Sequence, residues 1–182
     1  ANKVEEYFRL KNRVLPLLPG LRINNSKAVA ITNRKTEQSH LVVGFHGVKF
    51  DDPDRYILKL LALILGGSMS SRMFTEIREK RGLAYAVRTS SSSYREAGTF
   101  ETQAGVPHRK VRDAIKAILE EYRKVADKGV TEAELRRAKE IVNGRTLISF
   151  EDSLEVAEYY AVAETMGKNI IQIPDLIHIY EK

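Results

Sequence analysis

Residues 65–87 read LGGSMSSRMFTEIREKRGLAYAV, and they decide how the chain folds because a helical pattern changes to a strand pattern within them. A glycine pair ends one helix, and residues 71–80 predict another, in which Met73 and Ile77 lie one turn apart. Gly82 supplies the residue that can adopt a positive φ after the helix C-terminus. An alternating pattern follows at once. The stretch therefore predicts a helix and a strand joined by a tight turn.

Strand patterns lie on both sides of this stretch. Residues 27–35 and 38–48 are rich in β-branched and aromatic residues and are separated by a polar break, so they predict two neighbouring strands. Residues 83–94 and 98–106 predict a second pair, because the connection between them has the length of a hairpin loop. Together they predict a mainly antiparallel sheet of about four strands.

The other segments have helical periodicity. Asp52 and Pro53 mark the start of one helix, as N-cap and first helical residue. Its expected buried positions are Ile57, Leu60, Leu61 and Ile64. A second helix follows Pro107 and has an apolar stripe made of Val111, Ile115, Ile118, Leu119, Tyr122 and Val125.

A capping box opens the next helix, since Thr131 and Glu134 have the T-x-x-E spacing. Further helical segments are expected at about 151–165 and 172–181. Strands followed by helices in this order predict an α+β fold, in which the helices cover one face of a mainly antiparallel sheet.

Length and composition suit one compact domain of 182 residues, of which 43% are hydrophobic. We expect residues 1–20 to form a leading helix and a linker, because LPLLPG within them is a breaker sequence, and residues 21–182 to form the domain. Cysteine is absent, which excludes disulfides and thiolate metal sites and fits a reducing compartment. The longest apolar run, LLALIL at 60–65, is far shorter than the roughly 18 residues of a membrane span, so no membrane association is expected.

The net charge of +6 raises the question of nucleic-acid binding. In residues 109–128 and 131–145, however, bases alternate with acids at helical spacing, as they do on solvated helix faces. A nucleic-acid partner is therefore not expected.

The four histidines do not predict a metal site. His40 and His46 share one face of a predicted strand, but no carboxylate near them completes a set of ligands. His178 begins HIYEK, which differs from the inverted zinc motif H-x-x-E-H by having Lys182 at the position of the second ligand. An ammonium group does not bind zinc, so we expect no metal in this chain.

Three elements in a fixed order carry a family resemblance: GGSMSSRMF at 66–74, REKRGLAYAV at 78–87 and ELRRAK at 134–139. From about residue 25 onward the chain resembles the C-terminal half of the insulinase, pitrilysin and mitochondrial processing peptidase family of zinc peptidases, the inverzincins. In that family two homologous halves close around an unfolded peptide, and the N-terminal half carries H-x-x-E-H. The C-terminal half supplies an arginine and, seven residues later, a tyrosine.

The resemblance implies that Arg78 and Tyr85 are the catalytic and substrate-binding residues of this chain. A phenol can donate its O–H to the oxyanion of peptide hydrolysis, and a guanidinium can hold a substrate carbonyl. If the family resemblance is set aside, the residues favour an ordinary structural interpretation. Tyr85 is then a tyrosine of a sheet, and Arg78 is a cation at a helix terminus.

The absence of H-x-x-E-H implies a chain that cannot assemble the zinc site alone, so the isolated chain is expected to be inactive. It looks like an excised or truncated second half, whose end near Lys182 precedes a further helical segment of the family. The expected cofactor is zinc in the partner half and none here. The expected partners are that half and an unfolded peptide, with self-association of the isolated chain, in a bacterial cytoplasm.

Two alternatives remain open from the sequence. One is a non-catalytic structural subunit of the same fold, like the core subunits of the respiratory cytochrome complex. The other is a peptide-binding module that uses an exposed sheet edge.

Overall fold

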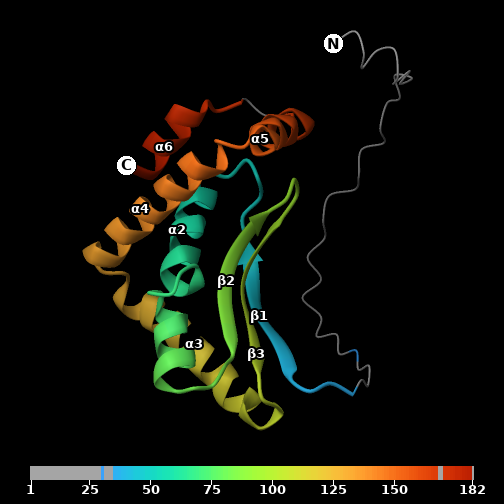
Figure 1. The fold of residues 1–182 in the computed structure, drawn as a ribbon, viewed down its shortest axis with the longest axis vertical. Coiled ribbons are helices and arrows are strands. Elements are labelled where there is room, and N and C mark those ends of the chain that lie inside the picture. Colours follow the sequence, from blue (N-terminus) through green and yellow to red (C-terminus); the bar gives the residue numbers. More distant parts are fainter. Residues whose placement is uncertain (1–29, 31–34, 168–169, 182) are drawn as a thin grey trace.

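A computed structural model describes residue 30 and residues 35–167 and 170–181. The expected leading segment 1–20 and nearly all of the first strand candidate, 27–35, lie outside the described residues. The described part is a three-stranded antiparallel sheet with helices packed on it (Figure 1). The α+β fold predicted from the sequence is confirmed.

The sheet has the order β1-β3-β2. Its strands are β1 (Ser39–Gly47), β2 (Ala86–Ser93) and β3 (Gly98–Val106). β2 and β3 form the expected hairpin, in which Ser93 is opposite Gly98. β1 pairs along the other side of β3, from Ser39 opposite Val106 to Gly47 opposite Gly98.

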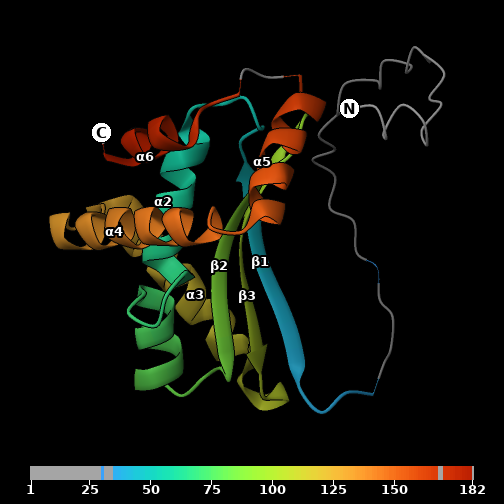
Figure 2. The same cartoon turned by 45° about the horizontal axis from the view of Figure 1, so that its top comes forward.

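Residues of the sheet alternate between a covered and an open face, as the pleat requires. Leu41, Val87 and Ala104 are aligned in register and are buried on the covered face. Their neighbours Val42 and Arg88 are exposed on the other face. Figure 2 shows α2, α3 and α4 on one side of the sheet. The expected covering of one face by helices is therefore confirmed for the described residues.

The described part of the chain contains seven helical elements, which lie between and after the strands. Three of them precede or flank the hairpin: α2 (Asp54–Gly66), the π-helical η1 (Phe74–Lys80) and the short η2 (His108–Lys110). The other four are α3 (Val111–Lys128), α4 (Glu132–Ser149), α5 (Ser153–Thr165) and α6 (Ile173–Glu181). Each helical segment that was predicted within the described residues is present, although the predicted helix 71–80 is wider than an α-helix from Phe74 onward.

The C-terminal end of α2 presses directly on β2. A Cβ atom at Gly66 would lie 2.4 Å from the backbone nitrogen of Thr89, so only glycine fits there. Below this contact the core contains Leu65, Met73 and Ile77, all fully buried. The helix that carries Met73 and Ile77 is thus fixed against the sheet by its apolar side.

Some expected burial is wrong in detail. Ile57 is 63% exposed, because the buried face of α2 is formed instead by its last turn and a half, residues 62–66. In α3 the fully buried positions are Ala114 and Ala117 together with Ile118, whereas Leu119 is 44% exposed. Asp52 precedes the N-cap residue Pro53, yet its carboxylate still accepts a hydrogen bond from the Asp54 N–H.

Among the described residues, no helix combines the length and the apolar character that crossing a membrane requires.

Candidate functional site

Arg78 lies on the π-helical turn of η1. A π-helix closes its hydrogen bonds over five residues instead of four, and such turns are frequent at functional sites. The side chain is exposed, and its guanidinium carbon lies 4.7 Å from the centroid of the Phe74 ring. Stacking on an aromatic face holds a guanidinium while its N–H groups remain available to a ligand.

Gly82 makes the turn that follows, with φ of +55°. The Leu83 N–H donates to the Ile77 carbonyl at 2.8 Å, which closes the helix end. Lys110 at the start of α3 donates from Nζ to the Gly82 carbonyl at 2.7 Å. The predicted role of Gly82 is confirmed, and the turn is held from both sides.

Tyr85 follows three residues later, immediately before β2. Its N–H donates to the Gly105 carbonyl at 2.9 Å, so its backbone is already part of the sheet. The residue is nevertheless 64% exposed. Its hydroxyl has no hydrogen-bond partner among the described residues, so it is available to an external acceptor.

The structure places Arg78 and Tyr85 at the two ends of one short, fixed turn, and both side chains are exposed. They form no hydrogen bond with each other. Neither lines either of the two main hollows found in the described part of the chain.

A partly buried ion pair fixes the helix that carries Arg78. Arg72 donates from Nε to Glu134 Oε1 at 2.6 Å and from Nη2 to Oε2 at 2.7 Å. Glu134 also accepts from the Thr131 N–H at 2.8 Å, which completes the predicted capping box of α4. The hydrogen bonds from Arg72 and Thr131 hold the pKa of Glu134 at about 2, well below its ordinary value.

The sequence did not predict the Arg72–Glu134 pair, because Glu134 was already assigned to the capping box and Arg72 to the motif at 66–74. The only signal was the capping box, which marks Glu134 as a fixed carboxylate. A fixed, partly buried carboxylate is usually paired with a cation, because an unpaired buried charge is unfavourable.

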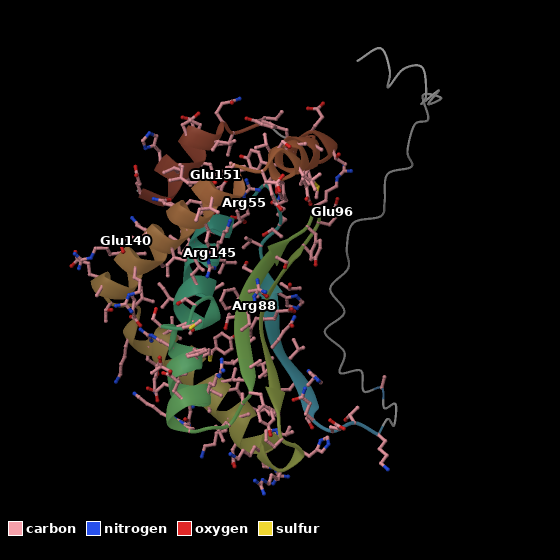
Figure 3. The ribbon with its side chains drawn as sticks, viewed as in Figure 1. Arg55, Arg88, Glu96, Glu140, Arg145 and Glu151 are labelled. Atoms are coloured by element: carbon pink, nitrogen blue, oxygen red, sulfur yellow. The ribbon has the colours of Figure 1, made fainter. Side chains whose placement is uncertain are left out.

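One hollow, here called the β2 groove, was also missed. It has a volume of about 740 Å³ and runs beside residues 87–91 of β2. Its opposite wall consists of residues 66–69 after α2 and the C-terminal half of α4. Figure 3 labels Arg88 on β2 and Arg145 on α4, one on each wall.

A second hollow of about 750 Å³ adjoins the β2 groove and shares Lys59 and Ser91 with it. It lies among α2, α5 and α6, and aromatic residues such as Tyr56 and Tyr159 line it. Burial raises the pKa of the Tyr159 phenol, whose O–H donates to the Ile171 carbonyl at 2.8 Å. This hollow is therefore largely apolar, with carboxylates among its lining residues, whereas the β2 groove combines apolar side chains with hydroxyl groups and cations.

The histidines do not come together. His40 and His46 are exposed on the open face of the sheet. His108 accepts or donates at Ser39 Oγ, 2.8 Å away, and His178 lies 2.9 Å from Glu181. Within the described residues, no three His, Asp or Glu side chains are grouped as metal ligands.

The small antiparallel sheet with helices on one face defines the fold class. The chain belongs to the family described as the peptidase M16 inactive domain, whose profile matches residues 2–142. The resemblance found in the sequence is confirmed, and so is the expectation of a zinc-lacking half.

The relatives agree with this assignment. An uncharacterized zinc protease of Streptomyces coelicolor is 40% identical over 149 residues, which cover 82% of this chain and 32% of the relative. The uncharacterized zinc protease YmxG of Bacillus subtilis is 36% identical over 120 residues, or 66% of this chain and 29% of the relative. The chain thus spans about a third of the length of these curated relatives.

Solved structures share the fold. A peptidase M16 inactive domain from Pseudomonas fluorescens aligns with a TM-score of 0.73 at 23% identity, over 81% of this chain and 35% of that one. A chain of complex III2 from Candida albicans aligns equally well, with a TM-score of 0.73 at 18% identity, over 82% of this chain and 38% of that one.

Proposed function

We propose that this chain is the zinc-lacking half of a zinc metalloendopeptidase, similar to mitochondrial processing peptidase. With a zinc-bearing half it closes over an unfolded peptide and stabilises the transition state of hydrolysis. The observation that carries the proposal is the turn at Gly82, which holds Arg78 and Tyr85 exposed at its two ends while the backbone on both sides is fixed.

Each residue has a chemical role in this proposal. The zinc of the partner half would supply a Lewis acid and an activated water. The Tyr85 hydroxyl donates to the substrate carbonyl oxygen as that oxygen gains charge, where a fixed donor is most effective. Arg78 donates to a neighbouring carbonyl of the peptide and adds positive potential. Both acceptors are backbone groups, so the pair serves peptides of varied sequence.

Reconstitution tests the proposal. The chain is mixed with a zinc-bearing half that contains H-x-x-E-H, and cleavage of a fluorogenic unfolded peptide is followed. We expect activity only when both halves are present, and its loss when Arg78→Ala and Tyr85→Phe are combined. A zinc half that is equally active alone would contradict the proposal.

The relatives come from bacteria, and together with the absence of cysteine this supports the bacterial cytoplasm as the place of action.

A structural subunit is the second candidate, and the likeness to a chain of complex III2 favours it. In that case the chain would stabilise an assembly without touching substrate. The double variant at Arg78 and Tyr85 then leaves every activity of the assembly unchanged, whereas the peptidase proposal requires a loss.

A further inference from the structure

The edge of the sheet formed by β2 is open in the part of the chain that the structure describes. The strand order is β1-β3-β2, so β3 is the only described strand that pairs with β2. An edge strand presents a row of N–H and C=O groups to which an extended chain can add by main-chain hydrogen bonds. β2 is made largely of serine and threonine, so its edge is polar.

The β2 groove runs along this edge. Five consecutive residues of β2, 87–91, line it, which at about 3.3 Å per residue corresponds to roughly 16 Å of strand. Its opposite wall contains Gly67, Val142 and Thr146. The groove is therefore long enough for a short extended segment, with the edge of β2 on one side and side chains of α4 on the other.

The charge of the groove has one sign. Lys59 and Arg145 line it together with Arg88, whose side chain is exposed on the other face of the sheet, and none of the lining residues is acidic. No ion pair among the described residues includes any of the three cations. Arg145 donates from Nη2 to the Gly67 carbonyl at 2.9 Å, which holds its guanidinium at the wall while other N–H groups remain free. Glu140, on the same helix, does not line the groove.

Lys59 fits the same interpretation. Burial together with the nearby charge of Arg55 lowers the pKa of its ammonium group. A carboxylate entering the groove would favour the charged ammonium group and so raise this pKa again. Hydroxyl donors add to the cations, because Ser68, Ser90 and Ser149 also line the groove.

We propose that the β2 groove binds an extended acidic peptide segment, which adds to β2 as a further strand and places a carboxylate beside Arg145 and Lys59. Main-chain pairing gives the extended conformation, and the cations select the acidic side chain. Arg78 and Tyr85 do not line this groove, so it is a second peptide site. It does not depend on the proposed peptidase function, and the chain should show it without a zinc half.

Labelled pentapeptides test the proposal on the 182-residue chain. The probe is acetyl-Thr-Val-Glu-Val-Thr-amide, followed by fluorescence anisotropy at low and at high salt. The matched peptide with glutamine in place of glutamate should bind about tenfold more weakly, since a hydrogen bond to a charged group is stronger than one to a neutral group. A third peptide with proline in place of both threonines and both valines lacks most of the N–H groups that strand pairing needs and should bind much more weakly than the glutamate peptide.

Variants locate the site. Arg145→Gln should weaken the glutamate peptide about tenfold and leave the glutamine peptide nearly unchanged. The matched control is Arg136→Gln, which removes an exposed cation of the same helix that does not line the groove. Lys59→Gln is a second variant if thermal melts show that Arg145→Gln is unfolded. Hydrogen exchange should show new protection of residues 86–93 when the glutamate peptide is bound.

Several outcomes overturn the proposal. Equal binding of the glutamate and glutamine peptides removes the role of the cations, and equal binding of the proline peptide removes strand pairing. If none of the three peptides binds at about 1 mM, a concentration at which a weak site is still detected, the groove is not a peptide site. Equal weakening by Arg136→Gln would show that net charge, and not this groove, attracts the peptide.

Discussion

Tyr85 is 64% exposed although the buried part of β2 begins two residues later, at Val87. In the complex of two halves, Tyr85→Phe should lower kcat on the order of 10²-fold and change KM little, because the lost O–H acts on charge that develops in the transition state. Steady-state kinetics on a peptide substrate measure this. Folding should be unchanged, since the hydroxyl has no partner in the described structure. An unchanged kcat removes Tyr85 from the mechanism and favours a structural subunit.

Arg78 is held by its stacking on Phe74, 4.7 Å away. Arg78→Ala should raise KM as well as lower kcat, because a group that holds a substrate carbonyl also contributes to ground-state binding. Arg78→Lys should restore little of either, since an ammonium lacks the planar set of donors. Arg123→Ala, an exposed arginine of α3, is the control and should leave both constants unchanged. Full activity of the lysine variant would contradict the expected geometry.

At the scale of single residues, the sequence predicted what depends on local geometry. Gly82 and the Thr131–Glu134 cap are of this kind, because their signals lie within a few neighbouring residues. The Arg72–Glu134 pair joins residues far apart in sequence and was not predictable. The proposed functional pair, Arg78 and Tyr85, could be selected only through the family motif, since an exposed arginine and an exposed tyrosine are ordinary surface residues.

Among the elements, α3 shows the limit of periodicity. The spacing predicted a stripe that includes Ile115 and Leu119, but Ala114 and Ala117 are the residues against the sheet. Small residues let a helix approach closely, and a count of large apolar residues cannot detect that. Glu121 is also buried on this side, paired with Lys124 at 2.5 Å. The sequence therefore predicted the helix, its amphipathic character and most of its apolar stripe, but it missed the buried alanines and included two exposed residues.

The stability that the Arg72–Glu134 ion pair gives to the contact between α4 and the helix carrying Arg78 should depend on pH. Glu134 has a pKa of about 2 in the folded chain and an ordinary value when unfolded. A lowered folded-state pKa stabilises the fold above the unfolded value, and this stabilisation is lost as the pH falls from about 4.5 toward 2. Glu134→Gln should therefore be less stable at pH 7 and should show a shallower loss of stability below pH 5, measured by urea titrations. If the free energy of unfolding falls equally steeply below pH 5 in both proteins, this expectation is wrong.

Two glycines in helices should respond oppositely to alanine. Gly66→Ala should destabilise the fold by about 1–3 kcal/mol, since the new Cβ would overlap the backbone of Thr89. Gly144→Ala in α4 meets nothing within 4 Å and should stabilise by about 0.5–1 kcal/mol through helix propensity. Urea unfolding of both variants measures the difference. A neutral Gly66→Ala would mean that α2 can move away from β2 at little cost.

For the whole molecule, the class of fold was predictable because helical and alternating periods are visible in the sequence. The neighbours of each strand were predictable only for the local hairpin. The pairing of β1 with β3 joins segments far apart in sequence, so no short-range signal marks it. The β2 groove was hidden for the same reason, since α2, β2 and α4 each contribute part of it.

The isolated chain should self-associate. Ile148 and Leu154, near the junction of α4 and α5, are 69% and 70% exposed, and Leu147 is 56% exposed. An apolar surface of this kind is typical of an interface between obligate parts. Sedimentation velocity at several concentrations should show a species that grows with concentration. Leu154→Glu should reduce the effect, and a strictly monomeric chain throughout would argue against it.

The pairing of the sheet also sets an order of assembly. β2 and β3 are joined by residues 94–97 alone, so their hairpin closes a short loop and can form within microseconds. The pairing of β1 with β3 closes a much longer loop, because α2, η1 and β2 lie between the two strands in sequence. Such long-range closure is the slow part of folding. Until β1 arrives, both sides of the hairpin are uncovered, so the nascent chain is most vulnerable to mispairing in the interval after β3 has formed and before β1 has joined it.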